Sequence, residues 1–286
     1  GYDYRIGTYE VTNSQYASFL NSVAASDPNI LYEPAMGLDP TTGGITRSGS
    51  AGNYTYSVKE NFGDKPANYI TWFNAARMAN WMTNGQGSGG TESGTYTFDG
   101  RTSISAITRD PSNPNQVFLP TENEWYKAAY HQPASEGGDG DDYWLYATRS
   151  NDVPTAASAT STGDVANPGQ DVVNVDRGAN WNGSDQSDRG NVTTVGSAES
   201  TSFYGAFDMN GNVFEWNETL IFSSRGHRGG SFSNDEFNLR SSSRDFNNPS
   251  SVFDISGFRL ASNIPAPGSV AFVAIGAPLL VGRRRR

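Results

Sequence analysis

The chain has 286 residues, no cysteine, two histidines and a formal net charge of −10, and its last four residues, Arg283 to Arg286, are all basic. Without them, 16 basic side chains stand against 30 acidic ones, and this balance of −14 argues against a nucleic-acid partner, because binding to phosphates needs a basic surface. The lack of thiols excludes disulfides, thiolate zinc sites and cysteine nucleophiles, and two histidines exclude a three-histidine metal site.

The composition describes a folded chain rich in loops. Hydrophobic residues make up 35%, aromatic residues 12% and charged residues 17%, and there are 32 glycines. The apolar content is too high for a disordered chain, while the charged content is below that of most soluble proteins. We therefore expect one large or two small domains with much turn and loop around an aromatic core.

In the first half of the chain the pattern predicts a strand and two helices. The segment Tyr4–Val11 alternates well enough for a strand. A capping box at Thr12–Gln15 then precedes an apolar stripe with the spacing i, i+3, i+4, i+7, which predicts a helix. A second helix is predicted to begin at Thr71 and to end near Asn84–Gly85.

The middle of the chain contains one more helix signal and a long region without periodicity. A second capping box, at Thr121–Glu124, follows a proline and precedes Trp125 and further apolar residues, so a third helix is predicted there. The segment Tyr143–Ala147 reads as a short strand. Residues 150–204 are rich in Ser, Thr, Asn, Asp and Gly and are predicted to be an ordered, loop-built region.

The last segment, residues 263–286, differs from the rest. Pro265 and Pro267 interrupt the chain, residues 269–281 carry no charge, and the arginine cluster follows. Thirteen residues span about 20 Å as a helix against a hydrocarbon core of about 30 Å, so this is a marginal membrane segment with its arginines on the cytoplasmic side. The alternative is an amphipathic or buried C-terminal helix.

Several phrases in residues 4–261 together resemble one known family. They are Tyr9–Tyr16 with Phe19–Leu20, Pro66–Trp72, Phe118–Trp125 with Ala128–Ala129, Tyr204–Trp216, Arg228–Phe232, Arg240, Arg244 and Gly257–Arg259. In order and spacing they resemble the sulfatase-modifying-factor (formylglycine-generating enzyme) family. The resemblance implies an α+β, C-type-lectin-like fold over residues 1–262, with few helices, small twisted antiparallel sheets and much irregular loop.

The tail is similar to the PEP-CTERM sorting signal of bacteria, with Ala266 where that motif has glutamate. This resemblance implies export, a transient membrane anchor at residues 269–281, and processing by an exosortase-type membrane protease. The mature protein is then expected at the cell surface or in the extracellular matrix. Since the chain begins with Gly1, we also expect a processed or truncated start.

The resemblance also locates the positions of the family's catalytic cysteines. Active members use two cysteines shortly after the Arg228–Phe232 phrase to bind copper and oxidise a substrate cysteine. Here Asn234 falls near the first position, and Asn238 or Leu239 near the second. Because amide and aliphatic groups do not bind copper(I) as thiolates do, we predict no copper and no formylglycine-generating activity.

A first structural calcium site is implied in the Tyr204–Trp216 phrase. Its ligands would be the carbonyls of Asn210, Gly211 and Val213 with the carboxylate of Glu215, a set of oxygens that suits calcium. The alternative is an Asn–Gly turn followed by a strand with a solvated glutamate.

A second structural calcium site is implied upstream. It would use Asn180, the Trp181 carbonyl, Asp188 and the Gly190 carbonyl, and Asp185 is an alternative to Asp188. The acids of the turn at residues 139–142 lack a calcium-loop pattern and are expected to be an exposed acidic turn.

The family's substrate groove maps onto residues that also read as ordinary core and turn positions. They are Trp216, Ser231, Phe232, Arg240 and Arg244. Together with Arg259, the two arginines are expected to be partly buried and paired with acids such as Asp208, Asp245 or Asp254. Neither histidine, His131 or His227, lies in a nucleophile motif, so both are expected to be structural.

Two functions from different classes fit these features. The favoured one is an exported, catalytically inactive member that binds a protein, peptide or glycan, or that has a structural role. The alternative is an enzyme of altered chemistry in which Asn234, Asp235 or Glu236 takes part in acid–base catalysis.

Overall fold

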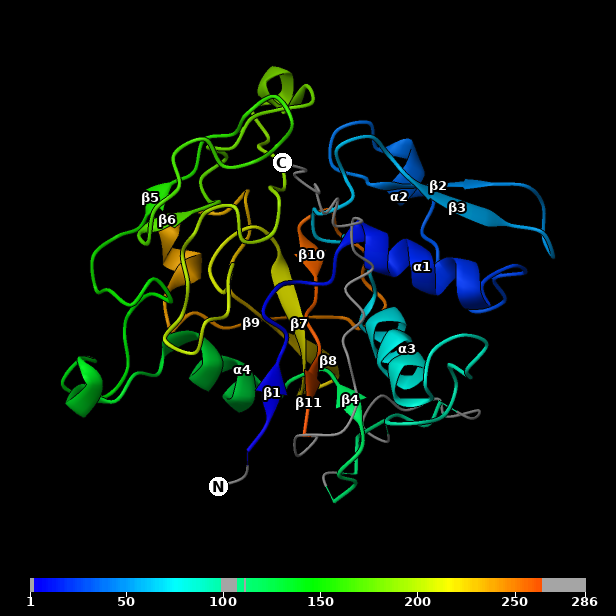
Figure 1. The fold of residues 1–286 in the computed structure, drawn as a ribbon, viewed down its shortest axis with the longest axis horizontal. Helices are drawn as coiled ribbons and strands as arrows, with labels where there is room; N and C mark the ends of the chain where they lie inside the picture. The colour runs from blue at the N-terminus through cyan, green and yellow to red at the C-terminus, as the bar shows by residue number, and fades with distance from the viewer. Residues whose placement is uncertain (1–2, 99–106, 111, 264–286) are drawn as a thin grey trace, which may run out of the picture.

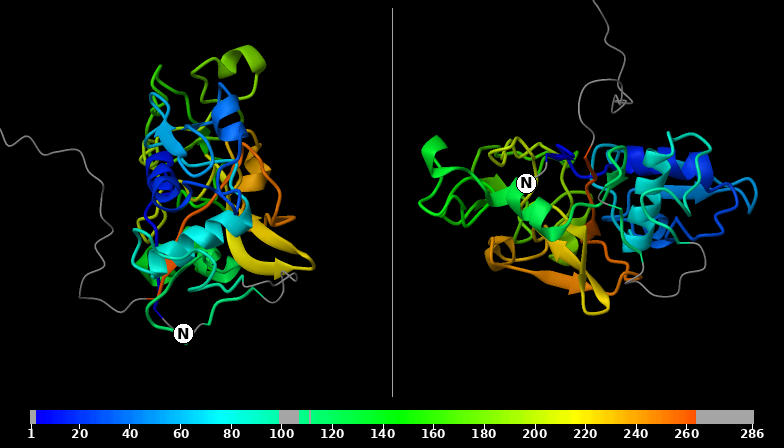
Figure 2. Two further views of the ribbon diagram at one scale, coloured as in Figure 1. Left: turned by 90° about the vertical axis from the view of Figure 1, so that its right-hand side faces the viewer. Right: turned by 90° about the horizontal axis from the view of Figure 1, so that it is seen from below.

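The computed structural model describes residues 3–98, 107–110 and 112–263. Helices α1 and α3 lie on one side of the molecule, irregular loops of the middle of the chain lie on the other, and strands β7 and β8 run between them (Figures 1 and 2). The predicted α+β architecture with much irregular loop is confirmed.

The three predicted helices are present, and local sequence explains their ends. They are α1 at Asn13–Val23, α3 at Trp72–Thr83 and α4 at Glu122–Tyr130, and a short helix, α2, covers Ala35–Leu38. Both capping boxes are formed: the N-cap hydroxyl accepts from the backbone N–H three residues on, and the side chain there accepts from the N-cap N–H. These contacts satisfy donors that a helix start otherwise leaves unpaired.

The strands are short and belong to four small sheets. The three-stranded sheet has β11 (Ala261–Ser262) between β1 (Arg5–Ile6) and β4 (Val117–Phe118). The four-stranded sheet has the order β10 (Ser256–Gly257), β7 (Phe214–Ile221), β8 (Ser224–Arg228) and β9 (Asp245–Asn247). The two-stranded sheets pair β2 (Ile45–Ser48) with β3 (Thr55–Val58) and β5 (Thr155–Ala156) with β6 (Val172–Val173). The described residues also include the 3-10 helices η2 (Ala134–Glu136), η3 (Ser184–Ser187) and η4 (Glu236–Leu239).

Two strand predictions were wrong in extent or kind. The alternating segment Tyr4–Val11 forms a strand only at Arg5–Ile6, because the chain then turns toward α1. The segment Tyr143–Ala147 is not a strand; it makes only isolated bridges, from Tyr143 to His131 and from Tyr146 to Ser150. Residues 150–204 are loop-built, as predicted, with only β5, β6 and η3 as regular elements.

The main core is aromatic and joins α1, α3 and β7. The α1 stripe of Tyr16, Phe19 and Leu20 is fully buried. Phe19 packs on Trp81 of α3 at 5.3 Å between ring centroids, and Trp216 of β7 belongs to the same cluster. Burial of these large rings is the main favourable contribution to stability on this side of the molecule.

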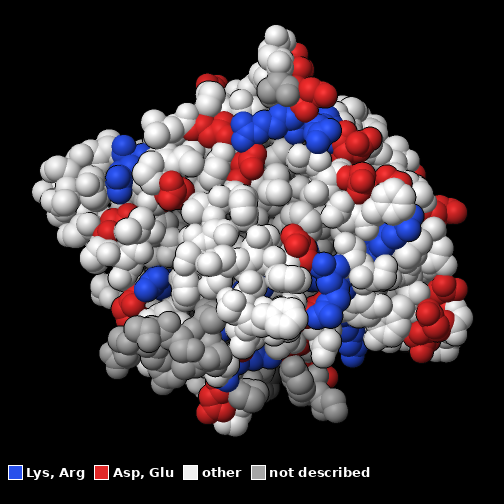
Figure 3. Space-filling view, turned by 180° about the vertical axis from the view of Figure 1, so that it is seen from behind, with Lys and Arg blue, Asp and Glu red and all other residues white. Residues whose placement is uncertain are grey.

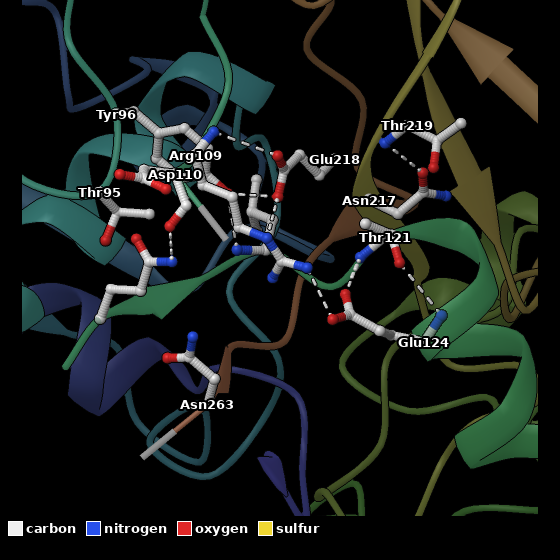
Figure 4. Close-up of polar contacts among 12 residues, drawn as sticks. Thr95, Tyr96, Arg109, Asp110, Thr121, Glu124, Asn217, Glu218, Thr219 and Asn263 are labelled. Atoms are coloured by element: carbon white, nitrogen blue, oxygen red, sulfur yellow. Dashed lines mark hydrogen bonds and ion pairs between the residues drawn. The ribbon is translucent and has the colours of Figure 1, made fainter. Parts of the chain in front are cut away.

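A buried ion-pair network ties α4 to β7 (Figure 4). Arg109 donates to Glu124 of α4 at 2.6 Å and lies 3.3 Å from the Glu218 carboxylate of β7. Its guanidinium also lies over the Phe118 ring, 3.6 Å from the centroid. Glu124 completes the α4 capping box as well, so one side chain fixes both the helix start and its attachment.

The face of the molecule in Figure 3 is sparsely charged. On the face in Figure 3, basic and acidic side chains are interspersed and most of the visible surface is uncharged. Within residues 3–98, 107–110 and 112–263, no helix is long and apolar enough to cross a membrane. The predicted sorting and anchor segment, residues 264–286, lies outside the described residues.

Candidate functional site

The family-like phrases converge on one buried ion pair, between Glu215 of β7 and Arg259. Arg259 donates to both oxygens of the Glu215 carboxylate, at 2.6 Å each, and the Trp125 indole donates to Oε2 at 2.8 Å. The two charged side chains are 0% and 1% exposed. The remaining Arg259 donors reach the carbonyls of Gly7 and Phe207. Through these contacts the ion pair joins the N-terminal segment, α4 and β7 to the segment that carries Arg259.

Two further carboxylates, those of Glu10 and Asp208, lie close to this pair. Glu10 is 1% exposed and accepts from Asn212 Nδ2 at 2.8 Å and from the Val213 N–H at 3.2 Å. Burial, with the nearby charges of Asp208 and Glu215, raises the pKa of Glu10 well above its usual range. Burial likewise raises the pKa of Asp208 to about 6. Three carboxyl groups thus surround one guanidinium, and the region can take up further positive charge.

The Asn–Gly turn before β7 is held by a close backbone approach. Gly211 has φ 77°, and a Cβ there would lie 2.2 Å from the Asn174 carbonyl oxygen, so only glycine fits. Asn212 also adopts a left-handed conformation, with φ 59°. Its side chain bridges Glu10 and the Thr193 N–H. The turn therefore positions amide groups between the loop region and the buried acids.

The residues of the first predicted calcium site lie in and directly after this turn, and the carboxylate of Glu215 already has protein hydrogen-bond partners. The Glu215 oxygens accept from Arg259 and Trp125, so a calcium ion would have to share that carboxylate with a guanidinium. The Asn210 side chain is also committed, since it accepts from the Ala147 N–H and donates to the Leu239 carbonyl. Glu215 is buried, unlike the solvated glutamate of the alternative interpretation. Excess carboxylates nearby favour a cation in this region, whereas the Arg259 contact opposes one at Glu215 itself.

The second calcium set is gathered around η3. Asn180 Oδ1 is 3.4 Å from the Ser184 hydroxyl, and the Trp181 carbonyl accepts from the Ser184 N–H. Asp188 is exposed with φ 49°, and Gly190 is buried with φ 73°. In the part of the chain that the structure describes, no group of three or more His, Asp or Glu side chains is close enough to hold a metal ion. Calcium here would depend mainly on carbonyl and amide oxygens, and it stays a prediction.

The positions that match the family's cysteines lie on one turn, with different surroundings. Asn234 is partly buried, accepts from the Ser231 hydroxyl at 2.6 Å, and its carbonyl accepts from the Asp176 N–H. Leu239, at the end of η4, is fully buried in an apolar cluster with Tyr146. Asn238 donates to Asp235 within the turn. None of these groups is a thiolate, so the turn presents amide and aliphatic atoms where the family has metal ligands.

The groove residues divide into buried and surface positions. Trp216, Ser231 and Phe232 are fully buried, which matches the core and turn interpretation that the sequence left open. Arg244 is 58% exposed and donates to both oxygens of Glu122, and Arg240 donates to the Tyr146 hydroxyl. Arg244 pairs with Glu122 and Arg259 with Glu215, neither of which was among the acids expected. Of those expected acids, Asp208 acts on Arg259 through its charge, and Asp254 pairs with Arg189.

The two histidines lie in different aromatic surroundings. His227 of β8 is buried against Trp216, 3.6 Å between ring centroids, and desolvation lowers its pKa to about 3, so the imidazole is neutral. His131 Nδ1 contacts the Tyr204 hydroxyl at 2.6 Å in a partly exposed aromatic group. His227 is thus packed in the core, whereas His131 makes a hydrogen bond to Tyr204 and stacks on its ring near the surface.

Sequence reasoning missed Glu10, the acid that completes the buried cluster. It lies inside the first family-like phrase, next to Val11, and reads there as an ordinary strand residue. The available signal was an acid within an otherwise apolar, aromatic phrase. Its partners Asn212 and Val213 are more than 200 residues away, so local pattern could not identify them.

Comparisons with known proteins identify the family and the fold of the chain. The sequence profile of the sulfatase-modifying factor enzyme 1-like domain matches residues 2–264. CarF has a similar structure, with a TM-score of 0.54 and 20% identity over 92% of this chain and 87% of that chain. Treponema denticola variable protein 1 gives 0.49 and 18% over 91% and 84%, and PvdO from Pseudomonas aeruginosa gives 0.44 and 17% over 90% and 78%. No curated protein matches. At such identities the likeness to CarF shows a shared fold.

Proposed function

The chain belongs to the family of sulfatase-modifying factor enzyme 1-like domains, and we propose that it is a member without cysteine-oxidising activity that works as an exported binding or structural module. The observation that carries this proposal is the turn at residues 234–239. Asn234, and Asn238 or Leu239, stand where the family resemblance calls for copper-binding thiolates, and Leu239 is buried in an apolar cluster. The scaffold is thus kept without the metal ligands that the family's oxidation needs.

The alternative enzyme with acid–base chemistry at this turn has little support. Asp235 is exposed and accepts from Asn238 of the same turn. Among the described residues, neither Asp235 nor Glu236 forms an ion pair with a second charged side chain. A general acid–base pair needs two titratable groups in reach of one substrate, so we do not adopt this reading.

The test is a direct assay for formylglycine. The purified protein is incubated with a cysteine-containing sulfatase peptide, copper and oxygen, and the peptide is analysed by mass spectrometry. We expect no conversion of the cysteine, while a family member with both cysteines converts it under the same conditions. Formylglycine above the level of a no-protein control would overturn the proposal.

Export and membrane anchoring are proposed from the tail sequence alone. The apolar residues 269–281 and the arginines after them would hold the acidic body outside the membrane until a protease of the exosortase type removes the tail. Mass spectrometry of the protein from its host is expected to show a C-terminus near Pro265–Pro267. A full-length protein with its arginines in place would contradict this processing.

We also keep structural calcium as part of the proposal. The excess of carboxyl groups around Arg259 and the long loops of residues 150–204 support a bound cation. One ion would be held by the carbonyls of Asn210, Gly211 and Val213 with the carboxylate of Glu215. A second ion would be held by Asn180, the Trp181 carbonyl, Asp188 and the Gly190 carbonyl. Bound calcium would supply positive charge and fix loop backbone that has little secondary structure of its own.

A further inference from the structure

The chain contains three Asn–Gly pairs, at residues 84–85, 182–183 and 210–211. In such a pair the glycine nitrogen can attack the side-chain carbonyl carbon of the asparagine, because glycine has no Cβ to obstruct the approach. The attack needs a glycine N–H that is free of hydrogen bonds and a backbone that can move. The fold therefore decides which of the three pairs can react.

In two of the pairs the glycine nitrogen is engaged in a backbone hydrogen bond. The Gly211 N–H donates to the Gly229 carbonyl at 2.9 Å, and Asn210 is only 3% exposed. The Gly85 N–H donates to the Met82 carbonyl at 3.2 Å. Each hydrogen bond must break before the nitrogen can attack, and at Gly211 the buried surroundings must open as well.

Gly183 differs from the other two glycines. It is exposed, and a Cβ built there would meet no atom within 4 Å, so there is open space around it. Its N–H makes no hydrogen bond to any part of the chain that the structure describes. Asn182 is also exposed and has φ 51°, in the left-handed region that non-glycine residues seldom occupy, so leaving this conformation relieves strain. Both observations favour attack by the Gly183 nitrogen.

The side chains of Asn182 and Asn84 are anchored to a similar degree. Asn182 Nδ2 donates to the two carbonyls of residues 40–41, at 2.8 and 3.2 Å. Asn84 Nδ2 donates to the carbonyls of Gly90 and Ser93, at 2.8 Å each. Either side chain must leave two carbonyls before it reacts, so this cost is similar in the two pairs. The main difference between them is the hydrogen bond of the glycine N–H.

We propose that Asn182 is the site of spontaneous deamidation in the native protein. Hydroxide takes the Gly183 N–H proton, and the nitrogen attacks Cγ of Asn182. The Cγ–Nδ2 bond breaks, and the amide nitrogen leaves as ammonia with a proton from water, which regenerates hydroxide. One water molecule then opens the succinimide ring to aspartate or isoaspartate, and no group is oxidised or reduced. The site uses none of residues 234–239, so it stands or falls separately from the proposed function.

The modification weakens the contact between the segment before η3 and the Pro40–Thr41 turn. The Asn182 amide donates to both carbonyls of that turn, whereas the carboxylate of the product has no donor and would face two acceptors. Asn191 Nδ2 still donates to the Thr41 carbonyl at 2.8 Å, so the loop stays attached at its other end. The new negative charge lies within residues 180–190, the segment of the second predicted calcium site.

The experiment follows the three Asn–Gly pairs in one sample. The purified protein is kept in mildly alkaline buffer and digested at intervals, and mass spectrometry measures the fraction of each Asn–Gly peptide in which a carboxyl group has replaced the amide. A digest at time zero corrects for deamidation during digestion. The same protein unfolded in urea is the matched control, because all three pairs should react there at similar rates once the fold no longer protects them.

In the folded protein we expect Asn182 to convert at least about fivefold faster than Asn84, a factor equivalent to about 1 kcal/mol, because the Gly85 hydrogen bond must open first. Asn210 should convert most slowly of the three, since it is buried. Asn182→Gln requires a larger ring and should stop conversion at this position while leaving the rate at Asn84 unchanged.

Hydrogen exchange tests the structural consequence. Backbone amides of residues 39–42 and 180–186 should exchange faster in the aged protein than in fresh protein, whereas ageing should leave exchange in the Asn182→Gln protein unchanged. Unchanged exchange in fully converted protein would refute the loosening of this contact.

The proposal itself is overturned if Asn182 is not converted in the folded protein, or if Asn84 or Asn210 is converted as fast. This comparison is made within the unaltered protein, so it decides the matter even where Asn182→Gln does not fold.

Discussion

At the scale of single residues, buried arginines determine how the family-like phrases fit together. Arg259 is fully buried and uses its guanidinium to join Glu215, Gly7 and Phe207. Burial of such an ion pair costs desolvation energy that offsets most of its electrostatic attraction. The pair therefore contributes more to the specific arrangement of these segments than to net stability. Removing one partner, however, leaves the other buried and uncompensated.

We therefore predict that Arg259→Met lowers the free energy of unfolding by about 3–5 kcal/mol, since Glu10, Asp208 and Glu215 would lose their counter-charge. The matched control is Arg189→Met, because Arg189 also joins two acids, Asp39 and Asp254, but its side chain is 36% exposed. There the loss should be about 1 kcal/mol or less. Urea unfolding of both variants measures the difference. Equal losses would show that burial of the Arg259 pair does not matter.

At the scale of elements, the helices could be predicted from sequence and most strands could not. The capping boxes at Thr12 and Thr121 act over three residues, and the apolar stripe of α1 acts over two turns, so both signals are local. In contrast, β1, β4 and β11 are two residues long and exist because distant segments pair. Periodicity in two residues carries no signal.

The same reasoning explains the error at Tyr143–Ala147. Its aromatic and apolar residues fit a strand by propensity, but within the described residues it makes only isolated bridges, and Tyr143 packs its ring on Tyr126. Strand preference is a statement about fit to a paired, half-buried surface. The local sequence signals predicted where the helices form. Which segments form strands depended on pairing between distant parts of the chain.

At the scale of the whole molecule, the open question is what stabilises the long loops. Regular elements within residues 150–204 amount to β5, β6 and η3. Side-chain amides join this region to the rest of the chain: Asn191 Nδ2 donates to the Thr41 carbonyl, and Asn174 Nδ2 donates to Asn212 Oδ1. An ion bound only by the native fold stabilises that fold by an amount that grows with the logarithm of the ratio of the ion concentration to its dissociation constant.

We predict that an excess of EDTA lowers the melting temperature of the calcium-loaded protein by roughly 5 °C or more. This follows from about 2.7 kcal/mol for a site at 100-fold its dissociation constant, with 2–4 °C per kcal/mol for a domain of this size. Differential scanning calorimetry measures the shift, and calcium should restore the value where magnesium does not.

Asp188→Asn should remove part of that shift, and Asp185→Asn, its exposed neighbour, should not. A melting temperature that is unchanged at saturating EDTA would rule out both calcium sites. If only Asp185→Asn reduces the EDTA-induced change in melting temperature, Asp185 and not Asp188 supplies the carboxylate of the second site.

By itself, the sequence determined the absence of thiol chemistry, the acidic balance of −14 outside the terminal arginines, the helix starts and the family resemblance. Each of these depends on residue identity or on contacts within a few residues. Only the tertiary structure decided that Glu215 pairs with Arg259 and that Glu10 joins them. Those features need side chains 44 to more than 200 residues apart to meet, and which distant segments meet depends on packing of the whole chain.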